Sequence, residues 1–160
     1  MAKLNRKAHA LYVDASMNGV TTDWYLIGKD IEELSIDLGP QVDTVENILG
    51  ETSVRDNGYQ PAISAEPYYA DPAENIYEPL VDIAMNRKKG DDCKSKYLEV
   101  IIADPEDTEH IAWQEDCILK PTSVGGDTSG LAIPFSIYPN GNRKQGKVTI
   151  TGGKPTFTAD

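Results

Sequence analysis

The sequence has few of the residues on which enzyme and metal chemistry most often depend. Its 160 residues include two cysteines, Cys93 and Cys117, and two histidines, His9 and His110. The cysteines lie far apart and have no close cysteine neighbour, so neither belongs to a zinc-ligand pair or a redox motif. We therefore expect two reduced thiols and no disulfide framework.

Long apolar runs are also missing. No segment approaches the roughly 20 consecutive apolar residues that a membrane-spanning helix needs. The first ten residues, MAKLNRKAHA, lack the apolar stretch of a secretory signal. Hydrophobic residues still make up 39% of the chain, which is enough for one domain with a packed core. We expect synthesis in the cytoplasm and no membrane partner.

Positive charge is scarce outside the N-terminus. The formal net charge is −11, and because Lys3, Arg6 and Lys7 give the first ten residues +3, residues 11–160 carry −14. A body this acidic repels phosphate backbones and is poorly suited to binding nucleic acid. We interpret residues 1–10 as a basic arm that could contact an acidic surface, including that of a second copy.

Strand patterns dominate what is present. In the segment 33–38, Leu34, Ile36 and Leu38 alternate with polar residues, which indicates a strand with one dry face and one wet, acidic face. The predicted wet face consists of Glu33, Ser35 and Asp37. Similar reasoning predicts strands at 9–15, 23–28, 96–103, 110–120, 131–137 and 146–151.

The remaining segments are less uniform. Residues 41–49 fit a helix or a bulged strand equally well, and Asn57-Gly58 indicates a hairpin turn. A helix is predicted over 78–88, with Pro79 in its first turn and Gly90 after its end. Its buried stripe would consist of Leu80, Ile83 and Ala84.

These elements predict a mainly β fold, an antiparallel β-sandwich or partly closed barrel with one packed α-helix. We divide the chain into the basic arm (1–10), a β domain (11–151) and a loosely held C-terminal tail (152–160).

The stretch GGDTSG at 125–130 looks superficially like a serine-protease nucleophile or a phosphate-binding loop. A serine nucleophile needs a histidine base and an orienting acid, and His9 lies in the basic arm. The glycines lack the Lys-Ser/Thr pair and the following helix of a phosphate-binding loop. We interpret residues 125–130 as a flexible loop between strands.

Other candidate sites are equally weak. The acidic stretch 104–110 matches neither an EF-hand nor a two-histidine zinc pattern. Glu32 and Glu33 are adjacent on a predicted strand, so they point to opposite faces. We therefore predict no catalytic, metal-binding or cofactor-binding residues and no enzyme activity. A non-catalytic module that binds carbohydrate through Trp24 or Trp113 remains an alternative.

Three stretches, taken in order, carry a resemblance to a known family. The first contains Trp24, Ile27-Gly28 and Glu32-Glu33-Leu34, and the second is ILGETSVRDNGYQP. After a central helix, the third is GGDTSGLAIPFSIYPNGNRKQGKV. Over about residues 11–151, the chain resembles the major tail tube proteins of long-tailed bacteriophages.

That resemblance implies a β-sandwich with a flanking helix, related in fold to the tube proteins of contractile tails and type VI secretion. Six copies would form a ring whose strands join into one β-barrel, and stacked rings would form a tube for double-stranded DNA. The implied partners are further copies of the chain and the tape-measure, tail-terminator and baseplate proteins. The implied location is the tail of the virion. We expect the protein to bind no cofactor.

The resemblance and the strand pattern together suggest that residues 33–66 form a long hairpin lining the channel. Its tip, near 49–57, would reach the next ring. Glu33, Ser35 and Asp37 would face the lumen. The expected contacts between rings are Lys3, Arg6, Lys7, Gly50, Glu51, Arg55 and Asp56.

Overall fold

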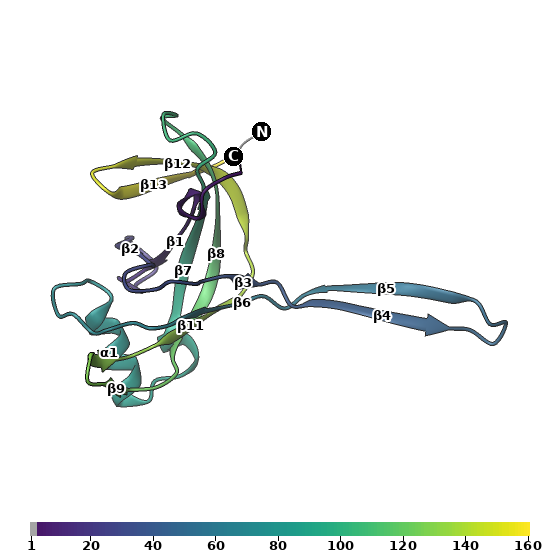
Figure 1. Cartoon of the computed structure of the whole chain (residues 1–160), viewed down its shortest axis with the longest axis horizontal. Coiled ribbons are helices and arrows are strands. Elements are labelled where there is room, and N and C mark those ends of the chain that lie inside the picture. Colours follow the sequence, from purple (N-terminus) through teal and green to yellow (C-terminus); the bar gives the residue numbers. More distant parts are fainter. Residues whose placement is uncertain (1–2) are drawn as a thin grey trace.

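The computed structural model describes residues 3–160, so Met1 and Ala2 of the predicted arm lie outside the described residues. A curled antiparallel sheet forms the body, and one long hairpin projects from its side (Figure 1). Within residues 3–160, no helix is long and apolar enough to cross a bilayer.

The strands of the body follow each other across one sheet, and every pairing is antiparallel. In spatial order they are β2 (Trp24–Leu26), β1 (His9–Asp14), β7 (Lys94–Ile101), β8 (His110–Pro121), β11 (Phe135–Pro139), β6 (Ala62–Ala65) and β3 (Ile36–Asp37), with β12 (Lys144–Thr151) and β13 (Lys154–Ala159) attached beside β8. The predicted mainly β, antiparallel fold with one helix is therefore confirmed.

The sheet branches at β8, its longest strand. One edge of β8 pairs with β7, whereas the other edge pairs with β12 over residues 110–114 and with β11 over residues 117–121. In Figure 1, β12 and β13 accordingly lie at the upper end of β8, and β11 lies at the lower end. This branching curls the sheet around a core.

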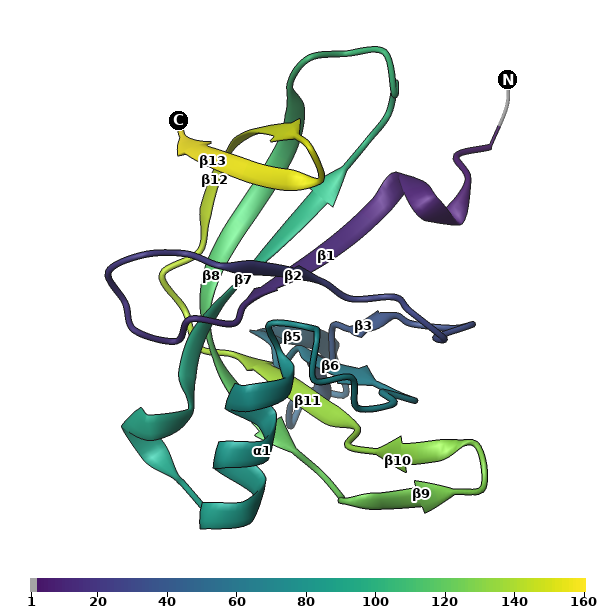
Figure 2. The ribbon, with the colours of Figure 1, turned by 90° about the vertical axis from the view of Figure 1, so that its left-hand side faces the viewer.

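The concave side of the sheet holds the larger of two hydrophobic clusters. Its fully buried side chains come from most body strands and include Val13, Leu119, Phe135 and Ile137. The helix α1 (Tyr77–Asn86) closes this side with Leu80, which is 0% exposed. Figure 2 shows α1 beside β11, at the end of the sheet away from β12 and β13.

The helix differs slightly from the predicted span of 78–88. Arg87 adopts a left-handed conformation, with φ of 53°, and the Lys88 amide donates a hydrogen bond to the Ile83 carbonyl. This arrangement ends the helix before Gly90. Leu80 and Ile83 are buried as predicted, while Ala84 is only half-buried.

We expected the C-terminal residues 152–160 to be loosely held, but most of them form a paired strand. The two-residue turn Gly152-Gly153 has φ of 58° and 79°, the conformation of a type I′ hairpin. It returns the chain as β13 along β12, and Phe157 packs on the second hydrophobic cluster, on the convex side of the sheet. A Cβ at Gly146 would lie 2.2 Å from the Thr158 carbonyl oxygen, so β13 crosses β12 closely there.

Residues 125–130 also differ from the expected flexible loop. They form a small hairpin of β9 (Gly125–Asp127) and β10 (Gly130–Ala132), in which a Cβ at Gly126 would lie 2.4 Å from the Gly130 carbonyl oxygen. The glycines therefore allow two backbones to approach closely, and the resemblance to a nucleophile motif has no structural counterpart.

Residues 36–65 form one nested hairpin, which agrees with the long hairpin predicted over 33–66. β3 and β6 pair at its base, and beyond them β4 (Pro40–Glu46) pairs with β5 (Thr52–Tyr59) in a separate two-stranded sheet. Residues 41–49, which fitted a helix or a strand, are thus mostly strand.

The prediction of a turn at Asn57-Gly58 is wrong. Both residues lie inside β5, where the register shifts between Pro40 and Val42 of the partner strand. Gly58 has φ of 91°, and the extra residue there is accommodated as a β-bulge. The chain reverses instead at residues 47–50.

Replacing Leu80 with Ala tests the role of α1 in the core. Leu80→Ala should lower the free energy of unfolding by about 2–5 kcal/mol, because it leaves a cavity among fully buried neighbours. Met85→Ala on the exposed side of the same helix should change it by less than about 1 kcal/mol. Urea unfolding followed by circular dichroism measures both. Equal losses in the two variants would contradict this account of the core.

Candidate assembly interface

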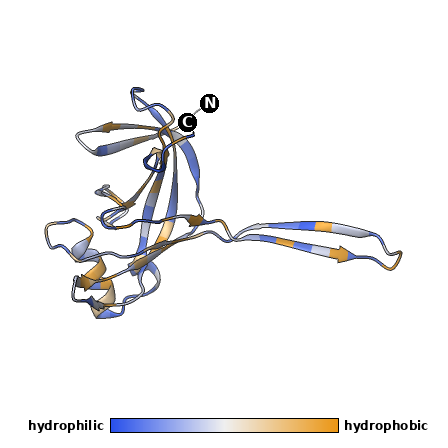
Figure 3. Ribbon diagram, viewed as in Figure 1, coloured by the Kyte–Doolittle hydropathy of each residue, from blue (hydrophilic) through white to orange (hydrophobic). Residues whose placement is uncertain are grey.

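The hairpin of β4 and β5 is the most exposed part of the molecule. Except for the half-buried Val45 and Gly58, every residue of the two strands is exposed. Hydrophobic residues, orange in Figure 3, lie along both strands and at the tip between them. The exposed fractions are 54% for Val42, 102% for Ile48, 76% for Leu49, 68% for Val54 and 64% for Tyr59.

Both long edges of this hairpin lack a partner strand. Among the described residues, β4 and β5 pair only with each other. An isolated two-stranded hairpin is at best marginally stable in water, and a long free edge is a template for pairing with another strand. The hairpin therefore offers two free edges at which a further strand could pair.

Each face of the hairpin combines apolar and polar residues. Cross-strand pairing places Val42 and Val54 on one face, and the bulge brings Tyr59 opposite Pro40 on that same face. The other face carries Asp43 opposite Arg55, and the Asn57 side chain donates to the Asp43 carboxylate at 3.0 Å. Asp56 pairs with Val42 and Thr44 with Val54, while Val45 shares the face of Asp43, so a neighbouring strand would extend two mixed surfaces.

The tip of the hairpin is held by one side chain. The Asn47 Oδ1 accepts hydrogen bonds from the amides of Leu49 and Glu51, at 2.9 and 3.0 Å. The Asn47 backbone adds a bond to Glu51 and one from Gly50. The turn is thus well defined, and it presents Ile48 and Leu49 to solvent.

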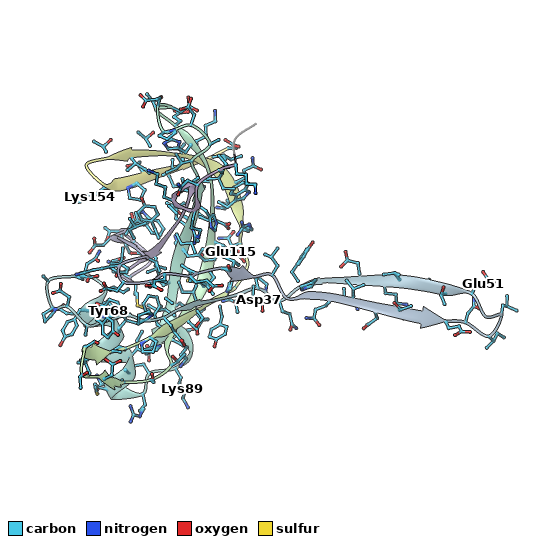
Figure 4. The ribbon with its side chains drawn as sticks, viewed as in Figure 1. Asp37, Glu51, Tyr68, Lys89, Glu115 and Lys154 are labelled. Atoms are coloured by element: carbon cyan, nitrogen blue, oxygen red, sulfur yellow. The ribbon has the colours of Figure 1, made fainter. Side chains whose placement is uncertain are left out.

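At the root of the hairpin, a polar network lies on the concave side of β7 and β8. Arg143 donates to Glu99 and Glu115, each at 2.9 Å, and to the Tyr97 hydroxyl at 2.8 Å. The His9 Nε2 and Glu99 Oε2 atoms are 2.7 Å apart, within hydrogen-bonding distance. Figure 4 shows Glu115 close to the place where the hairpin leaves the body, far from Glu51 at the tip.

This network has a definite electrostatic consequence. Burial by itself raises the pKa of Glu99, but hydrogen bonds from His9 and Arg143 outweigh it and hold the pKa below its ordinary value of 4.5. Burial, followed by the hydrogen bond to Glu115, raises the pKa of Tyr97. Glu99 is therefore charged at neutral pH, and Tyr97 is neutral.

The three residues predicted to line a channel share the wet side of the hairpin base. Glu33, Ser35 and Asp37 are all exposed, whereas Leu34 is buried and Ile36 half-buried. Only Ile36–Asp37 is strand, so the predicted strand over 33–38 is shorter than expected. Gly39, with φ of 53°, ends it.

The residues predicted to contact the next ring do not lie together. Gly50 and Glu51 are at the exposed tip, but Arg55 and Asp56 lie midway along β5. Lys3 and Lys7 are exposed near the start of β1.

Arg6 has a different environment from the two lysines. It donates to the carbonyls of His9 and Leu34, at 2.7 and 2.9 Å. It therefore ties the N-terminal segment to the chain just ahead of β3.

The alternative sites weighed from the sequence gain no support from this geometry. Trp113 lies under the Arg143 guanidinium, 5.8 Å from ring centroid to Cζ, and Trp24 packs against the convex hydrophobic cluster. Neither is an open stacking platform. Within residues 3–160, no group of three His, Cys, Asp or Glu residues is placed to hold a metal ion. Cys93 and Cys117 are buried and free.

Comparison with known proteins identifies the fold. No protein-family model and no curated protein sequence matches the chain. Among solved structures, a chain described as the sheath/tube terminator of an extracellular contractile injection system, PVC, in the extended state has a TM-score of 0.52 at 10% identity, over 99% of both chains. A chain from the anti-feeding prophage cap, described as its tube-terminating cap, has a TM-score of 0.56 at 11% identity, over 100% of this chain and 93% of that one. The chain therefore shares a fold with structures of contractile injection systems.

Arg143→Gln tests the network at the hairpin root. At pH 7 the variant should be about 1–3 kcal/mol less stable, because two mostly buried carboxylates lose a charged donor. Stability from the depressed pKa of Glu99 is present above 4.5 and is lost as pH falls through the folded-state pKa. The difference from the native chain should therefore shrink in acid.

Urea unfolding at pH 7 and in acid measures that difference. Lys147→Gln is the control, because its ion pair with Glu109 is exposed on both sides and should contribute little. A loss of stability for Arg143→Gln that is independent of pH would rule out the role assigned to Glu99.

Proposed function

We propose that this chain is a structural subunit of a phage-tail-like tube. Six copies form a ring, strands from neighbouring copies join into one barrel around a channel, and rings stack into a tube. The observation that carries the proposal is the projecting hairpin, whose two edges have no partner strand within residues 3–160. The shared fold with structures of contractile injection systems supports it.

Closure of a ring would pair the free edges of the hairpin with strands of neighbouring copies. When identical subunits associate head to tail and the rotation closes, every edge strand finds a neighbour. A closed barrel then leaves no exposed edge. The hairpin, marginal in one copy, would become part of a continuous sheet.

The charge of the chain supports a channel for an anionic polymer. Glu33, Ser35 and Asp37 lie exposed along the hairpin base, and Ser64 lies exposed on the adjacent β6. In a closed barrel this wet face would line the lumen. Acidic and small hydroxyl side chains repel phosphate groups or bind them weakly, so double-stranded DNA could pass without adhering.

A tube terminator is a second candidate, because one of the two similar structures is a sheath/tube terminator and the other is a tube-terminating cap. A terminator would form a ring at the tube end and stop further stacking. The two candidates predict different assemblies of the purified chain: a tube subunit gives hollow rods, whereas a terminator gives single rings. Negative-stain electron microscopy of concentrated protein distinguishes them.

Shortening the hairpin tests the proposal directly. A variant in which residues 43–55 are replaced by Asn-Gly should keep the melting temperature of the body within a few degrees, because the outer hairpin belongs to a separate sheet. It should form neither rods nor closed rings, since the edges that join neighbours are lost. Circular dichroism and electron microscopy measure the two effects. Normal tubes from the shortened variant would refute the proposal.

The basic arm provides an independent test. We propose that Lys3 and Lys7 contact an acidic neighbour in the stack, so Lys3→Glu with Lys7→Glu should reduce the yield of stacked rings several-fold. The reduction should be larger at low salt, where charges are less screened. Lys144→Glu with Lys154→Glu, two exposed changes on β12 and β13, is the charge-matched control. Light scattering across ionic strengths measures stacking, and an unchanged yield at every salt concentration counts against the arm.

A further inference from the structure

A hollow of about 410 Å³ lies where the hairpin leaves the body. One wall is apolar and comes from both strands at the hairpin root. The opposite wall belongs to the polar network on β7, β8 and the segment before β12. The apolar wall consists of Ile36, Leu38, Tyr59 and Pro61, and the polar wall of Tyr97, Glu99, Glu115 and Arg143. We refer to this hollow as the root socket.

The polar wall of the root socket is already satisfied. Glu115 accepts from the Tyr97 hydroxyl at 2.7 Å and from the Gly141 amide at 3.2 Å, in addition to its bond with Arg143. Glu99 is bonded to His9 and Arg143. A charged ligand would have to break these hydrogen bonds. An apolar ligand would leave them intact, and its own apolar surface would be removed from water.

The apolar wall, in contrast, is incompletely covered. Leu38 is 55% exposed and Tyr59 is 64% exposed. An exposed apolar surface beside a hollow is typical of a site that a partner covers. The chemistry of the root socket therefore favours an aliphatic side chain as its occupant.

The same chain carries a matching group at the far end of the hairpin. Ile48 and Leu49 are adjacent aliphatic side chains at the tip, both largely exposed, and the turn at Asn47 fixes the backbone that carries them. A molecule cannot fill its own socket with them. β4 has seven residues, which at about 3.4 Å each make a ribbon about 24 Å long that points away from the body.

We infer that the Ile48–Leu49 tip of one copy docks into the root socket of another copy. This inference rests on the proposed function, because it names the surface that receives the hairpin between stacked subunits. The two surfaces lie at opposite ends of one hairpin, so the contact is head to tail and repeats without closing. Repetition of this kind extends a stack rather than forming a symmetric pair.

Disulfide trapping tests the contact in the full-length chain. Leu49→Cys with Tyr59→Cys places one thiol at the tip and one in the root socket, too far apart to join within one molecule. Under mild oxidation, covalent chains of three or more copies should form at least ten times faster than from the control Leu49→Cys with Val20→Cys. Val20 is 88% exposed in a different loop, and the native Cys93 and Cys117 are buried. Equal rates in the two double variants would overturn the inference.

Complementation provides the second test. A tip variant, Ile48→Ser with Leu49→Ser, keeps its socket, and a socket variant, Leu38→Ser with Tyr59→Ser, keeps its tip. Each alone should lose stacking, while their mixture should form complexes two layers deep and no deeper. Sedimentation velocity detects this limit, and a mixture that associates no more than either variant alone would contradict the docking.

These tests separate the inference from the proposed function. Electron microscopy of the mixture shows whether the two layers are rings or single copies. Two-layer complexes of single copies would support the docking and reject the ring. Rings that stack normally after both tip residues are changed would reject the docking and keep the ring. If the tip instead docks on a different surface, the Val20 control reacts as fast as the socket variant, which rejects the inference.

Discussion

The unpaired backbone along the two edges of the projecting hairpin is the constraint on which the account depends. Among the described residues, β4 and β5 pair only with each other, so their outward edges have no partner strand, and most side chains on the ribbon are exposed. Neither the hydrophobic core nor α1 contributes to holding it. In the proposed assembly, its length and its ordered tip would serve the strands that lie beside it.

The body anchors this hairpin through β3 and β6 at its base. The curled sheet and α1 bury the concave cluster, and β3 and β6 connect that core to the ribbon. The network around Arg143 stiffens the wall below the root and joins β7, β8 and the N-terminal segment through His9. In the proposed assembly, such a root would let a bound neighbour align the whole hairpin.

The sequence predicted the antiparallel β fold, the helix and the long hairpin, because alternation and helix-ending signals are local. It misplaced the turn, since Asn57-Gly58 is a strong hairpin signal that β5 uses for a bulge, while Asn47 builds the true turn through its side chain. It also missed β13 and could not group the root socket, whose walls come from residues up to about 100 positions apart. The exposure of Ile48 and Leu49 was equally hidden, because local sequence patterns assume that apolar residues face a core.

Amide hydrogen exchange across residues 40–59, compared between dilute single copies and the concentrated assembly, tests the central claim most directly. The account predicts that the outward amides of both strands exchange rapidly in dilute protein and become strongly protected on assembly, while amides of the body strands change little. Rapid exchange of those hairpin amides in a fully assembled sample would contradict it.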